Sequence, residues 1–252
     1  MTETTVRPAR PAPNRALVED AALRYAGADA DEVLAWVAET FEPGRVAVAS
    51  SMADTALPHL VARHLPGVDV IFLDTGYHFP QTLATRDELA AGVDVTIRTV
   101  RAELTVAEQD EQHGPDLFAR DPAACCAMRK VQPLTRALAD YDAWITGVRR
   151  AESPTRAGTP VIEWDRTFDL VKVNPLVGWD DDAVAAYLST HDVPVNPLLS
   201  QGYPSIGCAP CTRRVESGED PRSGRWSGFA KTECGLHPGG DGIPVQAPKD
   251  MS

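Results

Sequence analysis

Five cysteines carry most of the reactive chemistry that this sequence offers, and four of them form two close pairs. Cys125 and Cys126 are adjacent in PAACCAMRK, and Cys208 and Cys211 form a Cys-x-x-Cys motif in IGCAPCTRRV. The Cys-x-x-Cys turn folds back so that both sulfurs reach one ion, whereas adjacent side chains on an ideal helix point about 100° apart. Joint metal binding by Cys125 and Cys126 therefore requires a bent helix end.

Four thiolates together suit either a tetrahedral zinc ion or an iron–sulfur cluster, and spacing does not separate the two. Without a metal, Cys125 and Cys126 would be small buried hydrophobic residues. Cys208 and Cys211 would then be a redox pair or half of a zinc site. The residues alone leave these alternatives open.

The fifth cysteine, Cys234, lies in KTECGLH, between Lys231 and His237. A thiol attacks only as thiolate, and an unperturbed cysteine with a pKa of about 8.5 is mostly protonated at neutral pH. Nearby cations favour the thiolate, which gives Lys231 or His237 a physical role. The alternative is an incidental thiol in a C-terminal tail.

The composition limits what the protein can bind. A formal net charge of −12 over 252 residues argues against general nucleic-acid binding, so an anionic ligand needs a local group of cations. Such a group occurs at 126–156, a segment that contains six Lys and Arg residues but only three Asp and Glu residues. No apolar run approaches the roughly 18 residues of a membrane span, and the start has no secretory h-region. We therefore expect a cytoplasmic protein with reduced thiols and no membrane partner.

Short apolar strands alternate with helical patterns along the chain. This order predicts an α/β fold, a mostly parallel sheet flanked by helices, because consecutive parallel strands need helical crossovers. Strands are predicted at 45–50, 68–76, 93–100, 143–150 and within 167–176, and helices at 53–65, 79–92, 104–112, 122–140 and 180–192. We divide the chain into a flexible arm (1–15), an α/β domain (16–226) and a mobile C-terminal segment (227–252) that carries Cys234.

Ligands of such sheets bind beyond the carboxyl ends of the strands, where three polar loops follow predicted strands. Small hydroxyls and backbone N–H groups near helix N-termini hold phosphate or ribose, and Asp74 suits ribose or adenine better than a polyanion. The alternative for Asp74 is that it only caps the next helix. Arg149 is either a site residue or a solvated surface charge. The candidate nucleotide contacts are Ser50, Ser51, Asp54, Asp74, Thr75, Gly76 and Arg149.

An ordered set of motifs runs from about residue 45 to 237: LDTGYHFPQT, CCAMRKVQPL, ITGVRRAESPTR, IGCAPCTRRV, GEDPRSGRW and KTECGLH. Taken together the set resembles the assimilatory sulfonucleotide reductases, specifically the iron–sulfur-containing adenosine 5'-phosphosulfate (APS) reductases. The resemblance implies an adenine-nucleotide alpha-hydrolase-like fold with an irregular C-terminal segment. It also implies a [4Fe–4S] cluster held by the four paired cysteines.

The resemblance further implies a reaction in which Cys234 attacks the sulfonate of APS, expels AMP and becomes an S-sulfocysteine. Thioredoxin or a similar thiol reductant then releases sulfite, while the cluster acts electrostatically. The segment carrying Cys234 must close over substrate and swing out to meet the reductant. The implied phosphosulfate contacts are Lys130, Arg156, Arg222 and Arg225, and we count His237 with the substrate-binding residues.

Other functions remain open from the sequence. Relatives that reduce 3'-phosphoadenosine 5'-phosphosulfate (PAPS) commonly lack the four paired cysteines, so APS is favoured, with PAPS or dual use as the alternative. A more remote reading is a zinc-stabilised nucleotide-binding or regulatory protein with an incidental Cys234. An ATP-dependent adenylyl or sulfur transferase would need a Gly-rich loop that SSMADT (50–55) lacks. This loop also lacks the Gly and the acidic pair that many sulfonucleotide reductases carry, and keeps only Asp54.

Overall fold

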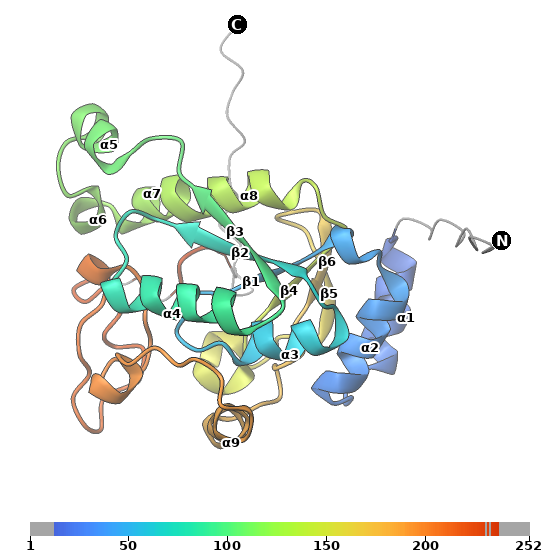
Figure 1. Ribbon diagram of the computed structural model, residues 1–252. Helices are drawn as coiled ribbons and strands as arrows, with labels where there is room; N and C mark the ends of the chain where they lie inside the picture. The colour runs from blue at the N-terminus through green and yellow to red at the C-terminus, as the bar shows by residue number, and fades with distance from the viewer. Residues whose placement is uncertain (1–12, 230, 232, 237–252) are drawn as a thin grey trace, which may run out of the picture.

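The computed structural model describes residues 13–229, 231 and 233–236, and it contains a six-stranded sheet in the order β3-β2-β1-β4-β6-β5 (Figure 1). Five strands are parallel, and the edge strand β5 pairs antiparallel with β6. The strands are β1 (Val46–Ala49), β2 (Val68–Asp74), β3 (Val95–Arg101), β4 (Ala143–Thr146), β5 (Ile162–Asp165) and β6 (Leu170–Val173). The predicted parallel α/β sheet is confirmed.

Helices cover both faces of the sheet. Figure 1 shows α3 and α4 on one face and α7 and α8 on the other, with α1 and α2 at the β5–β6 side. The helices of the described chain are α1 (Arg15–Arg24), α2 (Ala30–Thr40), α3 (Ala56–His64), α4 (Pro80–Gly92), α5 (Val106–His113), α6 (Leu117–Arg120), α7 (Pro122–Cys126), α8 (Gln132–Leu138) and α9 (Asp181–His191). Short 3₁₀ turns include Arg150–Glu152, Pro154–Arg156 and Ala209–Cys211.

Two hydrophobic clusters hold these layers together. The larger one joins α2 and α3 to the sheet and contains Leu34, Leu60 and Phe72, all almost fully buried. The smaller one joins α8 to the opposite face through Leu134 and Trp144. Burial on both faces explains why the central strands are continuous apolar runs.

Three parts of the fold differ from the sequence prediction. The helical pair α1 and α2 was not predicted, although Asn14 caps α1 and Asp29 begins a capping box on α2. Strand β5 was also missed. The helix predicted at 122–140 is interrupted, because a π-helical turn at Ala127–Val131 separates α7 from α8. The π-helical turn begins directly after Cys126.

The predicted arm (1–15) lies almost entirely outside the described residues, as does His237 of the predicted C-terminal segment. The division into arm, domain and segment therefore stays a prediction. Among the described helices, none combines the length and the apolar character that crossing a membrane requires.

Candidate active site

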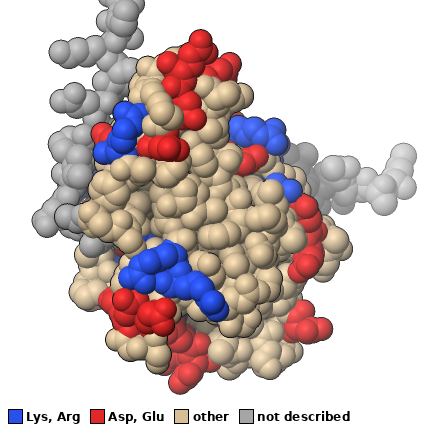
Figure 2. All heavy atoms as spheres, turned by 90° about the vertical axis from the view of Figure 1, so that its left-hand side faces the viewer, with Lys and Arg blue, Asp and Glu red and all other residues tan. Residues whose placement is uncertain are grey.

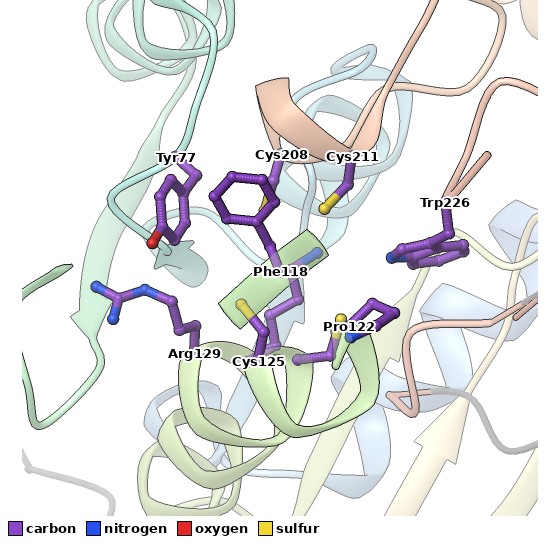
Figure 3. A pocket seen from close by; sticks show the side chains of 10 residues that line it. Tyr77, Phe118, Pro122, Cys125, Arg129, Cys208, Cys211 and Trp226 are labelled. Atoms are coloured by element: carbon purple, nitrogen blue, oxygen red, sulfur yellow. The ribbon is translucent and has the colours of Figure 1, made fainter. Parts of the chain in front are cut away.

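The two cysteine pairs, 83 residues apart in the chain from Cys125 to Cys208, line one pocket. Figure 3 shows Cys208 and Cys211 entering it from one side, on the turn Ala209–Cys211, and Cys125 from α7 on the other side. Cys125, Cys126 and Cys208 are buried, and Cys211 is half-buried. The structure thus brings together the four cysteines predicted to act together.

The helix that carries the adjacent cysteines departs from ideal α-helical geometry next to them. Asp121 accepts hydrogen bonds from the backbone N–H groups of Ala123 and Ala124 at 3.1 and 2.9 Å, which fixes the start of α7. The helix then widens into the π-helical turn Ala127–Val131. Such turns recur at functional sites because the extra residue changes the direction of the side chains. Here it lets two adjacent cysteines and Lys130 line the same pocket.

Burial dominates the electrostatics of these thiols. It raises the pKa of Cys125 to about 12, with a further contribution from Cys126, Cys208 and Cys211. Burial likewise raises the pKa of Cys211 to about 11, assisted by Cys208. Among the described residues, no three His, Cys, Asp or Glu side chains are arranged to hold a metal ion jointly. Without a positive ion these groups are thiols at neutral pH, and a bound cationic centre would reverse that.

The loop after β2 supports the cysteine pocket. Thr75, predicted as a nucleotide contact, is buried and its hydroxyl lies 3.3 Å from the sulfur of Cys208. The Thr75 carbonyl accepts a hydrogen bond from Nε of Arg129 at 2.5 Å. Arg129 is buried, lines the pocket and also donates to Gln109 at 2.9 Å. The sequence reasoning missed Arg129, although it precedes Lys130 in the CCAMRK motif.

Lys130 and Arg225 are two buried cations that interact electrostatically with the cysteine sulfurs. Burial lowers the pKa of Lys130, but the thiols of Cys208, Cys234 and Cys126 raise it, and the pKa ends above its ordinary value. The pKa of Arg225 is lowered by burial, with Cys234 as its strongest opposing neighbour. Cys234 therefore interacts electrostatically with both cations and with Cys126. The sequence instead predicts Lys231 or His237 as its cation, and His237 lies outside the described residues.

Arg225 is held in a close-fitting position. Its Nη1 donates to Ser205 Oγ and to the Ile206 carbonyl, both at 3.2 Å, and its guanidinium lies 4.5 Å from the centre of the Trp226 ring. Its Nε is buried without a hydrogen-bond partner among the described residues. A Cβ on Gly207 would lie 2.1 Å from Nη2, so glycine is required for this approach. Trp226 also contacts Lys231, whose Nζ is 5.6 Å from the ring centre.

Arg156 and Arg222, predicted as phosphosulfate contacts, bind a carboxylate of the chain itself. Arg156 donates from Nε and Nη2 to the two oxygens of Glu233, both at 2.9 Å. Arg222 donates to Glu233 Oε2 at 3.2 Å. Glu233 immediately precedes Cys234 and was missed by the sequence reasoning. The available signal was an acidic residue next to the reactive thiol in a region rich in predicted cations.

The first loop is shaped by contacts within the chain. Ser50 Oγ accepts a hydrogen bond from the Met52 N–H at 3.3 Å, while Ser51 is exposed. Met52 is buried in the left-handed backbone region at φ 58°, a conformation that glycine adopts more easily. Asp54 Oδ1 accepts from the Ala56 N–H at 3.1 Å, and burial raises its pKa. Asp54 therefore closes a turn immediately before α3, whose N-cap residue is Thr55.

Asp74 and Arg149 also have partners in the chain. Asp74 accepts from the Gly76 N–H at 3.1 Å and pairs with Arg101 at 3.1 Å. Arg149 donates to Asp181 at 2.8 Å. Figure 2 shows the side of the molecule toward which β2 runs, with Lys and Arg in small groups beside Asp and Glu. The chain thus keeps its positive charge in local clusters.

The fold defines an α/β protein of the adenine-nucleotide alpha-hydrolase-like class. FMN adenylyltransferase of Candida glabrata shares this fold, with a TM-score of 0.53 at 13% identity over 87% of this chain and 74% of that one. Phosphoadenylyl-sulfate (PAPS) reductase of Candida auris, solved with phosphate, superposes with a TM-score of 0.67 at 28% identity, covering 82% of this chain and 100% of that one.

Sequence comparison identifies the family. The model of the phosphoadenosine phosphosulfate reductase domain matches residues 45–214. Adenosine 5'-phosphosulfate reductases of Mycolicibacterium smegmatis and Streptomyces coelicolor are each 55% identical over 223 residues, or 88% of this chain and 94% of theirs. The chain belongs to the phosphoadenosine phosphosulfate reductase family, and the predicted resemblance is confirmed.

Gly76 provides a test of the loop that carries Thr75. It lies at φ 75°, and a Cβ there would approach Val106 Cγ2 to 2.9 Å. We expect Gly76→Ala to lower the free energy of unfolding by about 1–2 kcal/mol, because a side chain strains this conformation. Gly178→Ala, which adds a Cβ in open space, is the matched control. Urea denaturation of both variants measures the difference, and equal stabilities would contradict the argument.

Proposed function

We propose that this protein reduces APS to sulfite and AMP through an S-sulfocysteine on Cys234. The observation that carries the proposal is the pocket lined by the four paired cysteines and Lys130, beside which the neighbours of Cys234 are fixed: Gly235 lies against Val131 and Leu236 packs on the hydrophobic cluster of α8. The relatives named APS reductase, at 52–55% identity over most of the chain, support APS as the substrate. The family makes the protein an oxidoreductase of sulfate assimilation.

In the first step the Cys234 thiolate, its proton lost to solvent, attacks the sulfonate sulfur. A sulfur–sulfur bond forms, the sulfur–oxygen bond to the nucleotide breaks, and AMP leaves with the electron pair. In the second step a reductant thiolate attacks Cys234 Sγ, and sulfite leaves with the electrons of the sulfur–sulfur bond. A second reductant thiol resolves the mixed disulfide, so that a dithiol of the thioredoxin type becomes a disulfide.

Lys130 and Arg225 are proposed to bind the phosphosulfate. Among the described residues neither forms an ion pair with a carboxylate, so both keep charge for an anionic ligand. The unpartnered Nε of Arg225 is a further free donor. Charged donors aimed at the sulfonate oxygens also stabilise the charge that develops as the sulfur is attacked. Arg156 and Arg222 complete the positive edge of the site while they bind Glu233.

The four paired cysteines are proposed to hold a [4Fe–4S] cluster. The chemistry of the four residues fits such a group, because thiolate sulfur is the usual ligand of these clusters and all four cysteines line one pocket. Their sulfurs must draw closer together to bind it, since no three described side chains are placed to hold a metal ion jointly. When bound, the cluster supplies a charged centre beside the phosphosulfate site. Thr75 and Arg129 hold the pocket wall from the β2 side. The same donor set would also accept zinc.

The nucleotide is proposed to lie across the loops after β1 and β2, with Ser50, Ser51, Asp54 and Gly76 nearest it, and Asp74 toward ribose or adenine. Arg149 and His237 remain proposed contacts. PAPS is the alternative substrate, favoured by the fold of the Candida auris PAPS reductase at lower identity. We propose a cytoplasmic enzyme with a thioredoxin-like partner and no nucleic-acid or membrane partner.

The reaction is tested by mixing iron-replete protein with APS and with PAPS in parallel. We expect mass spectrometry to find one added sulfonate group on the Cys234 peptide after APS, and sulfite release once thioredoxin is supplied. Cys234→Ser is expected to form no adduct, since the nucleophile is lost. If APS leaves no sulfonate on Cys234, the proposed function is wrong. A faster reaction with PAPS would identify PAPS as the substrate.

The cluster is tested by the colour of anaerobically purified protein. We expect a brown protein with broad visible absorption, and we expect Cys208→Ser to lose most of it because one thiolate ligand is gone. Iron and zinc analysis of the same samples provides the second measurement. A colourless protein with one zinc ion per chain would exclude the cluster.

The packing of Arg225 against Gly207 gives a third prediction. Gly207→Ala must displace the Arg225 guanidinium, because the new Cβ would lie 2.4 Å from Cζ. We expect kcat/KM for APS to fall at least about tenfold, equivalent to about 1.4 kcal/mol of transition-state binding. Gly92→Ala, where a Cβ meets open space, is the control. Visible absorption shows whether the neighbouring Cys208 still holds its ligand, and an unchanged kcat/KM would remove Arg225 from the site.

A further inference from the structure

Glu233 is bound by two arginines from different parts of the chain. Arg156, on the turn after β4, holds it through two parallel hydrogen bonds of 2.9 Å. Arg222, on the loop before Trp226, adds a bond of 3.2 Å. The side chains of Glu233 and Arg156 are each only 12% exposed, and that of Arg222 is 17% exposed. A bidentate pair of this kind makes two charge-assisted hydrogen bonds in a fixed geometry, which restricts the orientation of the carboxylate more than an exposed ion pair does.

Each of the three nitrogens of Arg156 faces a carboxylate. Nε and Nη2 donate to Glu233, and Nη1 pairs with Glu152. Glu152 also lies 3.8 Å from Arg149, which pairs with Asp181, so the three arginines and three acids of this group balance in charge without any ligand. Lys130 and Arg225 differ, because neither faces a described carboxylate at ion-pair distance. Of the four predicted anion contacts, Arg156 and Arg222 therefore pair with Glu233. Lys130 and Arg225 form no ion pair with a described carboxylate.

Because Glu233 lies next to Cys234 in the chain, its ion pairs with Arg156 and Arg222 also restrain Cys234. Cys234 follows directly, and Leu236 packs against the hydrophobic cluster of α8 and the sheet. Gly235 lies at φ 88°, where a Cβ would lie 3.5 Å from Val131 Cγ2. Cys234 is therefore held between an ionic anchor on one side and an apolar anchor on the other.

We propose that Glu233 is a positioning residue, clamped by Arg156 and Arg222, that docks the segment carrying Cys234 over the anion site formed by Lys130 and Arg225. The clamp stays closed when the nucleotide binds, so the nucleotide and Glu233 do not compete. This inference depends on the proposed function, because it assigns Cys234 as the nucleophile that the clamp positions. Glu233 itself touches no reacting atom in the proposed reaction.

The test compares Glu233→Gln with Glu219→Gln. Glu219 pairs with Arg213 on an exposed part of the same region, so the control loses the same charge outside the site. The first readout is alkylation of Cys234 by iodoacetamide without nucleotide, followed by peptide mass spectrometry. Loss of a charged anchor of about 1.4 kcal/mol or more predicts alkylation at least about tenfold faster in Glu233→Gln, and no change in Glu219→Gln.

Steady-state kinetics with APS give the second readout. We expect kcat of Glu233→Gln to fall at least about tenfold while KM changes less than about twofold, since positioning is lost and anion binding is kept. ADP, an unreactive diphosphate analogue, should bind Glu233→Gln and the parent protein with the same Kd. Glu233→Gln combined with Arg156→Gln should be no worse than the worse single variant, because both remove one interaction.

Three results would overturn the proposal. Unchanged Cys234 alkylation would show that Glu233 holds nothing in place. A lower KM for APS, or tighter ADP binding, would show that Glu233 competes with the nucleotide for the arginines. Additive losses in the double variant would show that the two residues act separately. Alkylation and ADP binding involve no sulfonyl transfer, so failure of the clamp is distinguishable from absence of the S-sulfocysteine in the parent protein.

Discussion

Charge compensation at the carboxyl edge of the sheet is the constraint on which this structure depends. The chain has a net charge of −12, yet it places Lys130 and Arg225 where burial opposes their charge. A buried cation is tolerated only with an anion or strong hydrogen bonds. The neighbours of these two cations are sulfurs, three of them from the paired cysteines and one from Cys234. In the proposed function, cysteine thiolates and a phosphosulfate are the anions that would complete the site, which would explain why the cysteines and the two buried cations lie together.

The fold brings these groups together from segments far apart in the chain. Helix α7 supplies one cysteine pair, and the π-helical turn after it supplies Lys130. Cys208 and the turn Ala209–Cys211 supply the other pair, which the loop after β2 contacts through Thr75. Gly207 lets Arg225 approach the second pair closely. No single segment contains a complete site, so ligand binding and the packing of the irregular region after residue 200 depend on each other.

The sequence predicted the parallel sheet and the cysteine grouping because both leave local patterns. Apolar runs mark the strands, and the adjacent Cys125 and Cys126 required a departure from an ideal α-helix, which the π-helical turn after Cys126 provides. The roles of Thr75, Arg129 and Glu233 were not predictable in this way, because each depends on a partner more than 50 residues away. From the sequence alone, Glu233 beside Cys234 looks like a solvated surface charge, because its partners Arg156 and Arg222 are known only from the structure. Helices α1 and α2 were missed because strong apolar strands dominated the assignment.

An ionic anchor suits a segment that must both dock and leave. In the proposed reaction Cys234 faces the nucleotide first and a protein dithiol afterwards, so the docked state must be ordered but not permanent. When an ion pair opens, water solvates the separated charges and recovers much of the lost interaction, so the net cost of opening stays small. An apolar anchor of the same strength would expose hydrophobic surface each time it opened. Leu236 and Glu233 therefore have different roles in the proposed docking. Leu236 packs against α8, whereas the ion pairs of Glu233 orient Cys234 and still allow the segment to leave.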